Sequence, residues 1–181
     1  MHKKSLFFFT LTLISLLTQG CSTIIGTTKP VSDKSHDYQF LDLSEGNTNW
    51  SKIEQPIDDE ATEKGISDIA FKSKKTESII ALNSACRPIN ELNETNLESF
   101  SDQLFLGVSE IKNKTTKHIA VSSTPALETT LEGTMNSKSI KLRTIVLQKQ
   151  TCIYDIMYLS YPHFFQLEEK EFNRFVSAIR L

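Results

Sequence analysis

The sequence predicts an α+β fold, in which an antiparallel sheet is flanked by helices that include a C-terminal helix. Two observations support this class. Short apolar runs are separated by turn residues, as in strands that pair through tight turns. One helical pattern interrupts these runs, and a second helical pattern closes the chain. Strands in this order indicate the hairpins of an antiparallel sheet.

The chain opens with the pattern of an export signal. Lys3-Lys4 precedes an apolar segment, Leu6 to Leu17, which is too short to cross a hydrocarbon layer of roughly 30 Å as a helix. The following Leu17-Thr18-Gln19-Gly20-Cys21 resembles the bacterial lipoprotein box, although the preferred leucine lies one place early. We therefore expect residues 1–20 to be removed and Cys21 to receive diacylglycerol. The alternative is an ordinary signal cleaved nearby, which leaves Cys21 as a thiol.

Lipidation of Cys21 would place the protein on a membrane. Several acyl chains, such as palmitate, hold a protein stably there, since each buried methylene contributes about 0.8 kcal/mol. In the enterobacterial sorting rule, Ser22 after the cysteine favours the outer membrane over the inner membrane, with the protein facing the periplasm. Residues 21–37 are then a lipid-anchored tether, and residues 38–181 a single α+β domain.

The first part of the domain is expected to be mostly strand. Tyr38 to Leu43 reads as a strand, and Asn47 to Asp59 as turn and irregular chain. Two apolar runs follow, Asp68 to Lys72 and Ser78 to Leu82. The polar Lys74-Lys75-Thr76 between them predicts that they pair as a hairpin.

A helix is predicted to start at Thr95. Thr95 and Glu98 have the spacing of a capping box, and the pattern ends near Gly107. Four apolar residues recur at helical spacing: Leu97, Phe100, Leu104 and Val108. Phe100 and Leu104 are expected to face the core.

Further strands are predicted after this helix. They are His118 to Val121, then, beyond a turn at Ser122 to Pro125, Ser139 to Gln148 and Cys152 to Tyr161. Apolar and charged residues alternate from Ser139 to Arg143, which predicts one buried face and one solvent-exposed face.

The last strand and the last helix have distinct patterns. Cys152 to Leu159 is apolar on both faces and is interrupted only by Asp155, which is typical of a central strand covered on two sides. After a turn at Tyr161-Pro162-His163, a helix is predicted from Leu167 to Leu181. Its buried face is marked by Phe172, Phe175, Val176 and Ile179.

This order of elements resembles the PsbP/Mog1 α/β/α sandwich. The similarity runs from Asp68 to Leu181 and rests on four segments: Asp68-Ile69-Ala70-Phe71, Ile79 to Asn83, Cys152 to Asp155, and Phe172-x-x-Phe175-Val176-x-x-Ile179. Ile179 stands where that family more often has Phe. The resemblance implies an accessory or binding role, and it carries no catalytic residue across.

The remaining cysteines suggest a disulfide. With Cys21 assigned to lipid, Cys86 and Cys152 form an even pair in an oxidising compartment. Two buried free thiols or a redox-active pair are the alternatives. His36, His118 and His163 are scattered, so we expect no metal site and no cofactor.

Candidate binding residues cluster near the last strand. A carboxylate at Asp155 would be desolvated, which raises its pKa. Asp155 is then either a functional group or a structural acid at a sheet edge, where the backbone or a tyrosine hydroxyl forms hydrogen bonds to it. Aromatic residues that carry a polar group are favoured in ligand pockets and interfaces, and the alternative is that they belong to the core. The candidates are Tyr154, Asp155, Tyr158, Tyr161 and His163, with Phe164 and Phe165 beside them.

The leading hypothesis is a non-enzymatic, membrane-anchored periplasmic lipoprotein that serves as an accessory or binding domain. Its partner would be an envelope protein or an apolar ligand such as a lipid. A more specific form of this hypothesis places the protein in an envelope lipid-transport system. Basic and acidic residues are interspersed and the net charge is −2, so nucleic acid is not expected as a partner. The rival is a membrane-tethered hydrolase, although Ser84 and Ser160 lie in no Gly-x-Ser-x-Gly setting and no catalytic residue is assigned.

Overall fold

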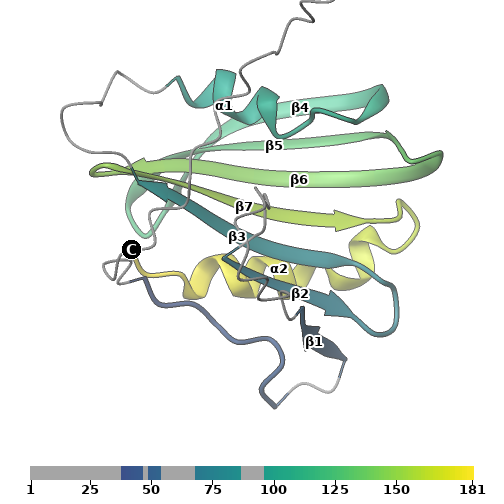
Figure 1. Cartoon of the computed structure of the whole chain (residues 1–181), viewed down its shortest axis with the longest axis horizontal. Helices are drawn as coiled ribbons and strands as arrows, with labels where there is room; N and C mark the ends of the chain where they lie inside the picture. Colours follow the sequence, from purple (N-terminus) through teal and green to yellow (C-terminus); the bar gives the residue numbers. More distant parts are fainter. Residues whose placement is uncertain (1–37, 47–48, 54–67, 87–95) are drawn as a thin grey trace, which may run out of the picture.

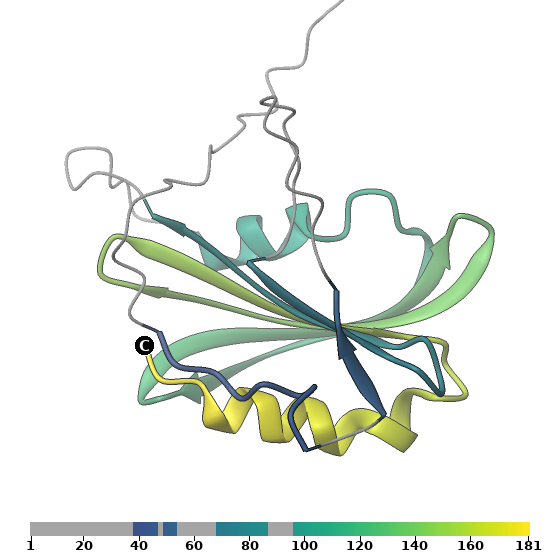
Figure 2. The same ribbon diagram turned by 60° about the horizontal axis from the view of Figure 1, so that its bottom comes forward.

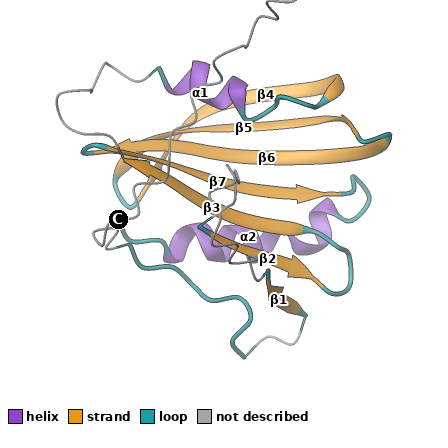
Figure 3. Cartoon of the chain, in the orientation of Figure 1, coloured by secondary structure: helices purple, strands orange, loops and turns teal. Residues whose placement is uncertain are grey.

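The computed structural model describes residues 38–46, 49–53, 68–86 and 96–181. In these parts of the chain, a seven-stranded antiparallel sheet has the order β1-β2-β3-β7-β6-β5-β4 and is accompanied by two helices (Figures 1 and 3). The elements are β1 (Trp50–Lys52), β2 (Ile69–Ser73), β3 (Ile79–Cys86), α1 (Leu97–Gln103), β4 (Ser109–Val121), β5 (Thr124–Met135), β6 (Lys138–Lys149), β7 (Cys152–Ser160) and α2 (Phe165–Ala178). The α+β prediction is confirmed.

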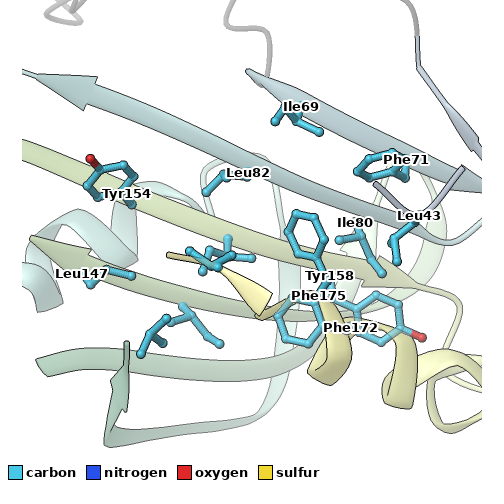
Figure 4. Close-up of a cluster of buried hydrophobic side chains, with 14 of the residues drawn as sticks. Leu43, Ile69, Phe71, Ile80, Leu82, Leu147, Tyr154, Tyr158, Phe172 and Phe175 are labelled. Atoms are coloured by element: carbon cyan, nitrogen blue, oxygen red, sulfur yellow. The ribbon is translucent and has the colours of Figure 1, made fainter. Parts of the chain in front are cut away.

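The two helices lie on opposite faces of the sheet (Figure 2). On the α2 face, Phe172 and Phe175 are fully buried in one cluster with strand residues such as Ile80 and Leu82 (Figure 4). On the α1 face, Phe105 packs with a smaller cluster that also contains Leu131, Ile140 and Leu142. The arrangement is therefore helix, sheet, helix.

The predicted central strand is β7. It pairs with β3 on one side and β6 on the other, and both of its faces are largely buried. The hairpin of β2 and β3 and the C-terminal helix are confirmed as well, with Ile79 opposite Lys72 and with Ile179 fully buried just after the helix. Apolar residues on both faces of one run thus located the middle of the sheet.

The N-terminal assignments need two corrections. Tyr38 to Leu43 is not a strand, because only Gln39 makes a backbone bridge there, to Arg180. Trp50–Lys52, expected to be irregular, is strand β1 and pairs with β2. Leu43 and Trp50 are both buried in the core, so their apolar character reflects packing and does not distinguish a strand from a coil.

The outer hairpin of β4 and β5 is longer than its pattern indicated. Most of β4 is exposed on both faces, so it shows no alternation of buried and wet positions. Its pairing with β5 is also interrupted by two register shifts, close to the positive φ angles of Glu110 and Asn113. Bulges and lysines on an edge strand oppose pairing with another chain. Strand β5 was not predicted at all.

Helix α1 differs from its prediction in its cap and its buried face. The cap is Asn96, whose side-chain oxygen accepts hydrogen bonds from the backbone of Glu98 and Ser99, whereas Thr95 lies outside the described residues. Phe105 is buried and Phe100 is only half-buried. Leu104 lies at the predicted core side, half-buried. The helix ends at Gln103, so the periodic pattern continues through turns that follow the helix.

Cys86 and Cys152 face each other across β3 and β7 and form a disulfide. The prediction of this pair is confirmed. Cys21, the expected leader and the expected tether lie outside the described residues. Within the described parts of the chain, neither helix has the length and apolar character that crossing a membrane would require.

Candidate functional site

A cavity lies between the first half of α2 and strands β4, β5 and β6. We call it the polar groove, and its volume is about 550 Å³. Eleven residues line it: Thr115, Thr116, Lys117, Glu128, Thr130, Lys141, Arg143, Phe165, Gln166, Glu169 and Asn173. Most of these side chains are charged or can form hydrogen bonds.

Arg143 is at the centre of the polar groove. Its Nη2 donates to Glu128 Oε2 at 2.6 Å, and its Nη1 donates to Glu169 Oε1 and Asn173 Oδ1, each at 3.0 Å. Its guanidinium also lies over the ring of Phe172, 5.1 Å from the centroid. These contacts join β5, β6 and α2 through one planar cation.

Two lysines extend this network towards solvent. Lys117 pairs with Glu128 at 2.9 Å, so Glu128 accepts from two cations although its side chain is only 6% exposed. Lys141 pairs with Glu132 at 3.0 Å. Its hydrogen bond holds the pKa of Glu132 below the usual value, and its positive charge acts in the same direction. Each of the three cations thus has a carboxylate partner within the chain.

Strand alternation explains why these charges meet under a helix. Lys141 and Arg143 share a face of β6 with the buried Ile145 and Leu147, since side chains two apart point the same way. The alternation in Ser139–Arg143 predicted that this face would be exposed to solvent. It is instead half-buried, because α2 crosses it, and the rings of Phe165 and Phe172 lie beneath the two cations.

Two of the predicted binding residues belong to the core on the α2 face. Tyr158 is fully buried, its hydroxyl donates to the backbone oxygen of Phe165 at 2.7 Å, and burial raises its pKa to about 12. Tyr154 is buried edge-on against Tyr38, and burial raises its pKa too. Neither tyrosine lines the polar groove.

The other candidate aromatic residues lie in the turn that leads into α2. Tyr161 is half-buried and stacks on the exposed His163, with ring centroids 6.0 Å apart. His163 also contacts the ring of Phe164. The structure therefore separates this pair from Tyr154 and Tyr158, and the five predicted residues do not form one site.

Asp155 lies on the α1 face of β7, away from the tyrosines. It is 7% exposed, and its carboxylate accepts a hydrogen bond from the side chain of Asn83 on β3. Burial raises its pKa to about 6, and this hydrogen bond opposes the shift. The expected desolvation is confirmed, but the partner is neither backbone nor tyrosine, and the strand is central instead of an edge.

The buried Asp155 carboxyl should make stability fall as the pH rises. Its folded pKa of about 6 exceeds the ordinary aspartate pKa of 3.8, so the folded protein holds this proton between those pH values while the unfolded chain loses it. We expect Asp155→Asn to be more stable than the wild type at pH 7 by on the order of 2 kcal/mol, and equally stable near pH 3. Urea unfolding from pH 3 to pH 8 measures this. An equal pH dependence in both proteins would contradict it.

Among the described residues, serine, histidine and carboxylate side chains do not form one hydrogen-bonded triad. Ser84 donates its hydroxyl proton to Asp68, and no hydrogen bond joins a histidine to a serine or a carboxylate there. His118 and His163 lie in the outer strand β4 and the last turn, respectively. No group of three or more potential metal ligands is found among these residues.

The polar groove itself was not predicted from the sequence. Its charged residues come from four elements, and each is an ordinary polar position within its own segment. One signal was present, because the charges at Lys141 and Arg143 were identified as one face of a strand. What lay opposite that face could not be read from local pattern.

Comparisons with known proteins support the fold. No protein-family model matches the sequence, and no curated protein matches it. Among solved structures, the chain is similar to cyanobacterial PsbP (CyanoP) from Synechocystis sp. PCC 6803, with a TM-score of 0.57 at 9% identity, over 83% of this chain and 89% of that one. A Pseudomonas aeruginosa protein of unknown function gives a TM-score of 0.45 at 10% identity, over 71% of this chain and 79% of that one. The similarity to CyanoP shows that the domain has a PsbP-like fold.

Proposed function

We propose that the chain is a lipid-anchored, periplasm-facing accessory domain that binds a protein partner in its polar groove. The export signal and the cysteine at position 21 support the location. The PsbP-like fold and the resemblance to PsbP/Mog1 proteins support an accessory role. The observation that carries the binding role is the groove, because it offers fixed charges of both signs beside amide and hydroxyl groups.

The chemistry of the groove favours a polypeptide over an apolar ligand. An apolar ligand would displace water from the exposed polar side chains of the groove, such as Lys117 and Gln166, without replacing the hydrogen bonds that water makes, which is costly. A polypeptide supplies both donors and acceptors. The more exposed charges, Lys117 and Glu169, can select a partner of complementary charge and speed its approach.

Site-specific photocrosslinking tests the groove directly. A photoreactive amino acid at Gln166, which is exposed in the groove, is expected to crosslink one protein in intact cells. The matched control is Ser177, an exposed position near the other end of α2 and outside the groove. Lys117→Gln should weaken the crosslink at Gln166, because it removes a positive charge from the groove wall.

The result at the two positions decides the proposal. Crosslinking of the same proteins at Gln166 and Ser177, or a crosslink that Lys117→Gln leaves at full intensity, would contradict the groove as the binding site. Urea unfolding of the Lys117→Gln protein checks that it remains folded. We expect little change in stability, since the Lys117 side chain is 64% exposed.

A second arm of the same experiment tests the anchor. Cys21→Ser should move the protein from the membrane fraction to the soluble periplasmic fraction and remove the mass of the acyl groups. Crosslinking at Gln166 should then fall, because the tether no longer holds the domain near its partner. If the Cys21→Ser protein stays membrane-bound with unchanged mass, lipidation is refuted. The groove is then tested separately, by comparison of the crosslinks at Gln166 and Ser177.

A further inference from the structure

A second, smaller pocket lies on the α1 face of the sheet, at the end where three turns meet. These are the turns between β2 and β3, between β5 and β6, and between β7 and α2 (Figure 1). The residues that line this end pocket include Ile79, Met135, Lys138, Ile140, Leu159 and Tyr161. Its volume of about 280 Å³ is close to the lower end of small-molecule sites, which span roughly 300–1,000 Å³.

The floor of the end pocket is apolar. Ile79 and Leu159 are directly paired across β3 and β7, and Ile140 and Met135 come from the neighbouring hairpin of β6 and β5. These side chains continue the small core cluster that packs under α1. Ile79, Met135 and Leu159 remain only partly buried, so apolar surface is left open in the pocket.

The rim of the pocket carries hydrogen-bond donors. The ammonium of Lys138 donates to the hydroxyl of Tyr161 at 3.4 Å and lies over its ring, 6.0 Å from the centroid. Within the described part of the chain, Lys138 pairs with no carboxylate. On the opposite wall, Lys72 pairs with Glu77 at 3.2 Å. The rim thus has two cations and one anion, and one of the cations is free to pair with a ligand.

The walls of the pocket are held in place before any ligand binds. Asn136 and Ser137 both have positive φ, as the two central residues of a type I′ hairpin turn do, so Lys138 starts β6 at a fixed position. The hydroxyl of Ser160 is hydrogen-bonded to Ser78 at 2.8 Å, which ties the end of β7 to the start of β3. A site formed in advance loses less conformational entropy on binding.

We propose that the end pocket binds a single-chain anionic amphiphile, with its alkyl chain on the apolar floor and its carboxylate or phosphate group against Lys138 and Tyr161. The Tyr161 hydroxyl accepts from Lys138 and can donate its own proton to the anionic oxygen. This proposal does not depend on the protein partner, because the end pocket and the polar groove lie on opposite faces of the sheet and share no lining residue.

Titration calorimetry below the critical micelle concentration tests the proposal. The protein is the full chain carrying Cys21→Ser, expressed with its own leader, so that no acyl group of its own competes. Dodecanoate and dodecyl phosphate are the probes, and dodecanol and acetate are the controls for chain and head group alone. We expect saturable one-to-one binding of at least one anionic probe, and binding of dodecanol that is weaker by roughly tenfold or more.

Substitutions at the rim should change affinity in opposite directions. Lys138→Gln is expected to bring the affinity for the anionic probe down to that for dodecanol, and Tyr161→Phe to weaken it by a smaller factor. Glu77→Gln should strengthen binding, because Glu77 is the one carboxylate among the described residues that line the pocket. Lys170→Gln, an exposed lysine of α2 that lines neither cavity, is the matched control and should leave binding unchanged.

Three results would overturn the proposal. They are no saturable binding of either anionic probe, equal binding of dodecanol, or binding that Lys138→Gln leaves unchanged while the variant unfolds in urea as the wild type does. If only dodecyl phosphate or only dodecanoate binds, the head group is identified. Lys117→Gln should retain amphiphile binding, so that a failure of the polar groove and a failure of the end pocket can be told apart.

Discussion

Removing the disulfide between Cys86 and Cys152 is expected to lower the free energy of unfolding by roughly 4 kcal/mol. The bond closes a sequence separation of 66 residues, and chain-entropy arguments relate the gain to that length. It also joins β3 directly to the central strand β7, whose other neighbour is β6. The loss should therefore affect the whole sheet and appear in a single unfolding transition.

Urea unfolding of Cys86→Ser with Cys152→Ser, compared with the oxidised wild type, measures this effect. Both proteins carry Cys21→Ser, so that no other thiol or acyl group differs. A reducing agent should destabilise the wild type by a similar amount and leave the double variant unaffected. Thiol labelling of the denatured, unreduced wild type should modify neither cysteine. Full labelling, or equal stability of the two proteins, would contradict the prediction.

Replacing Arg143 with methionine is expected to lower the free energy of unfolding by on the order of 3 kcal/mol. Methionine can keep much of the packing over Phe172, but it leaves Glu128, whose side chain is 6% exposed, with only the exposed Lys117 as its cation partner. Removing one member of a buried ion pair costs far more than the pair contributes, because the remaining charge stays desolvated. Urea unfolding at pH 7 measures the change.

A double-mutant cycle separates this effect from lost packing. Arg143→Met combined with Glu128→Leu should recover most of the stability that Arg143→Met loses, since neither charge is then left alone. The control is Lys72→Gln, which breaks the exposed pair with Glu77 and should change stability by less than about 1 kcal/mol. If the double variant is as unstable as the sum of its single changes, the ion pair is not the cause.

These two predictions also bear on how the polar groove is tested. Arg143 joins the groove residues through its hydrogen bonds, and its replacement is also expected to destabilise the fold, so a variant at this position would change both binding and stability. Lys117 and Gln166 line the same groove but are more exposed, and changes there should alter binding with little loss of stability. The binding experiment therefore uses those two positions.

Much of the fold was readable from the sequence because the signal was local. The run from Cys152 to Leu159 is apolar on both faces, and it proved to be the central strand. The spacing of Phe172, Phe175 and Ile179 located the buried face of the last helix. In contrast, polar and apolar residues are mixed along β5, so it lacks a clear strand pattern and was not predicted.

The candidate site was less predictable than the fold. Tyr154, Asp155 and Tyr158 were grouped because they are close in the sequence, yet alternation places Asp155 on the opposite face from the two tyrosines. The residues that do meet, Glu128, Arg143 and Glu169, are far apart along the chain and belong to β5, β6 and α2. Sequence proximity was the wrong guide to the site.

The fold class, the central strand, the C-terminal helix and the pairing of Cys86 with Cys152 were all predicted correctly from the sequence. Each of these predictions rests on the periodicity of apolar residues or on the number of cysteines, both of which can be read along the chain without knowing which distant segments are in contact. In contrast, the position of the charged face of β6 beneath α2 and the apolar floor between three turns beside Lys138 depend on contacts between distant segments, and they were seen only in the folded structure. A strand's alternation fixes which side chains share a face, but the elements that cover that face are fixed by packing over the whole chain.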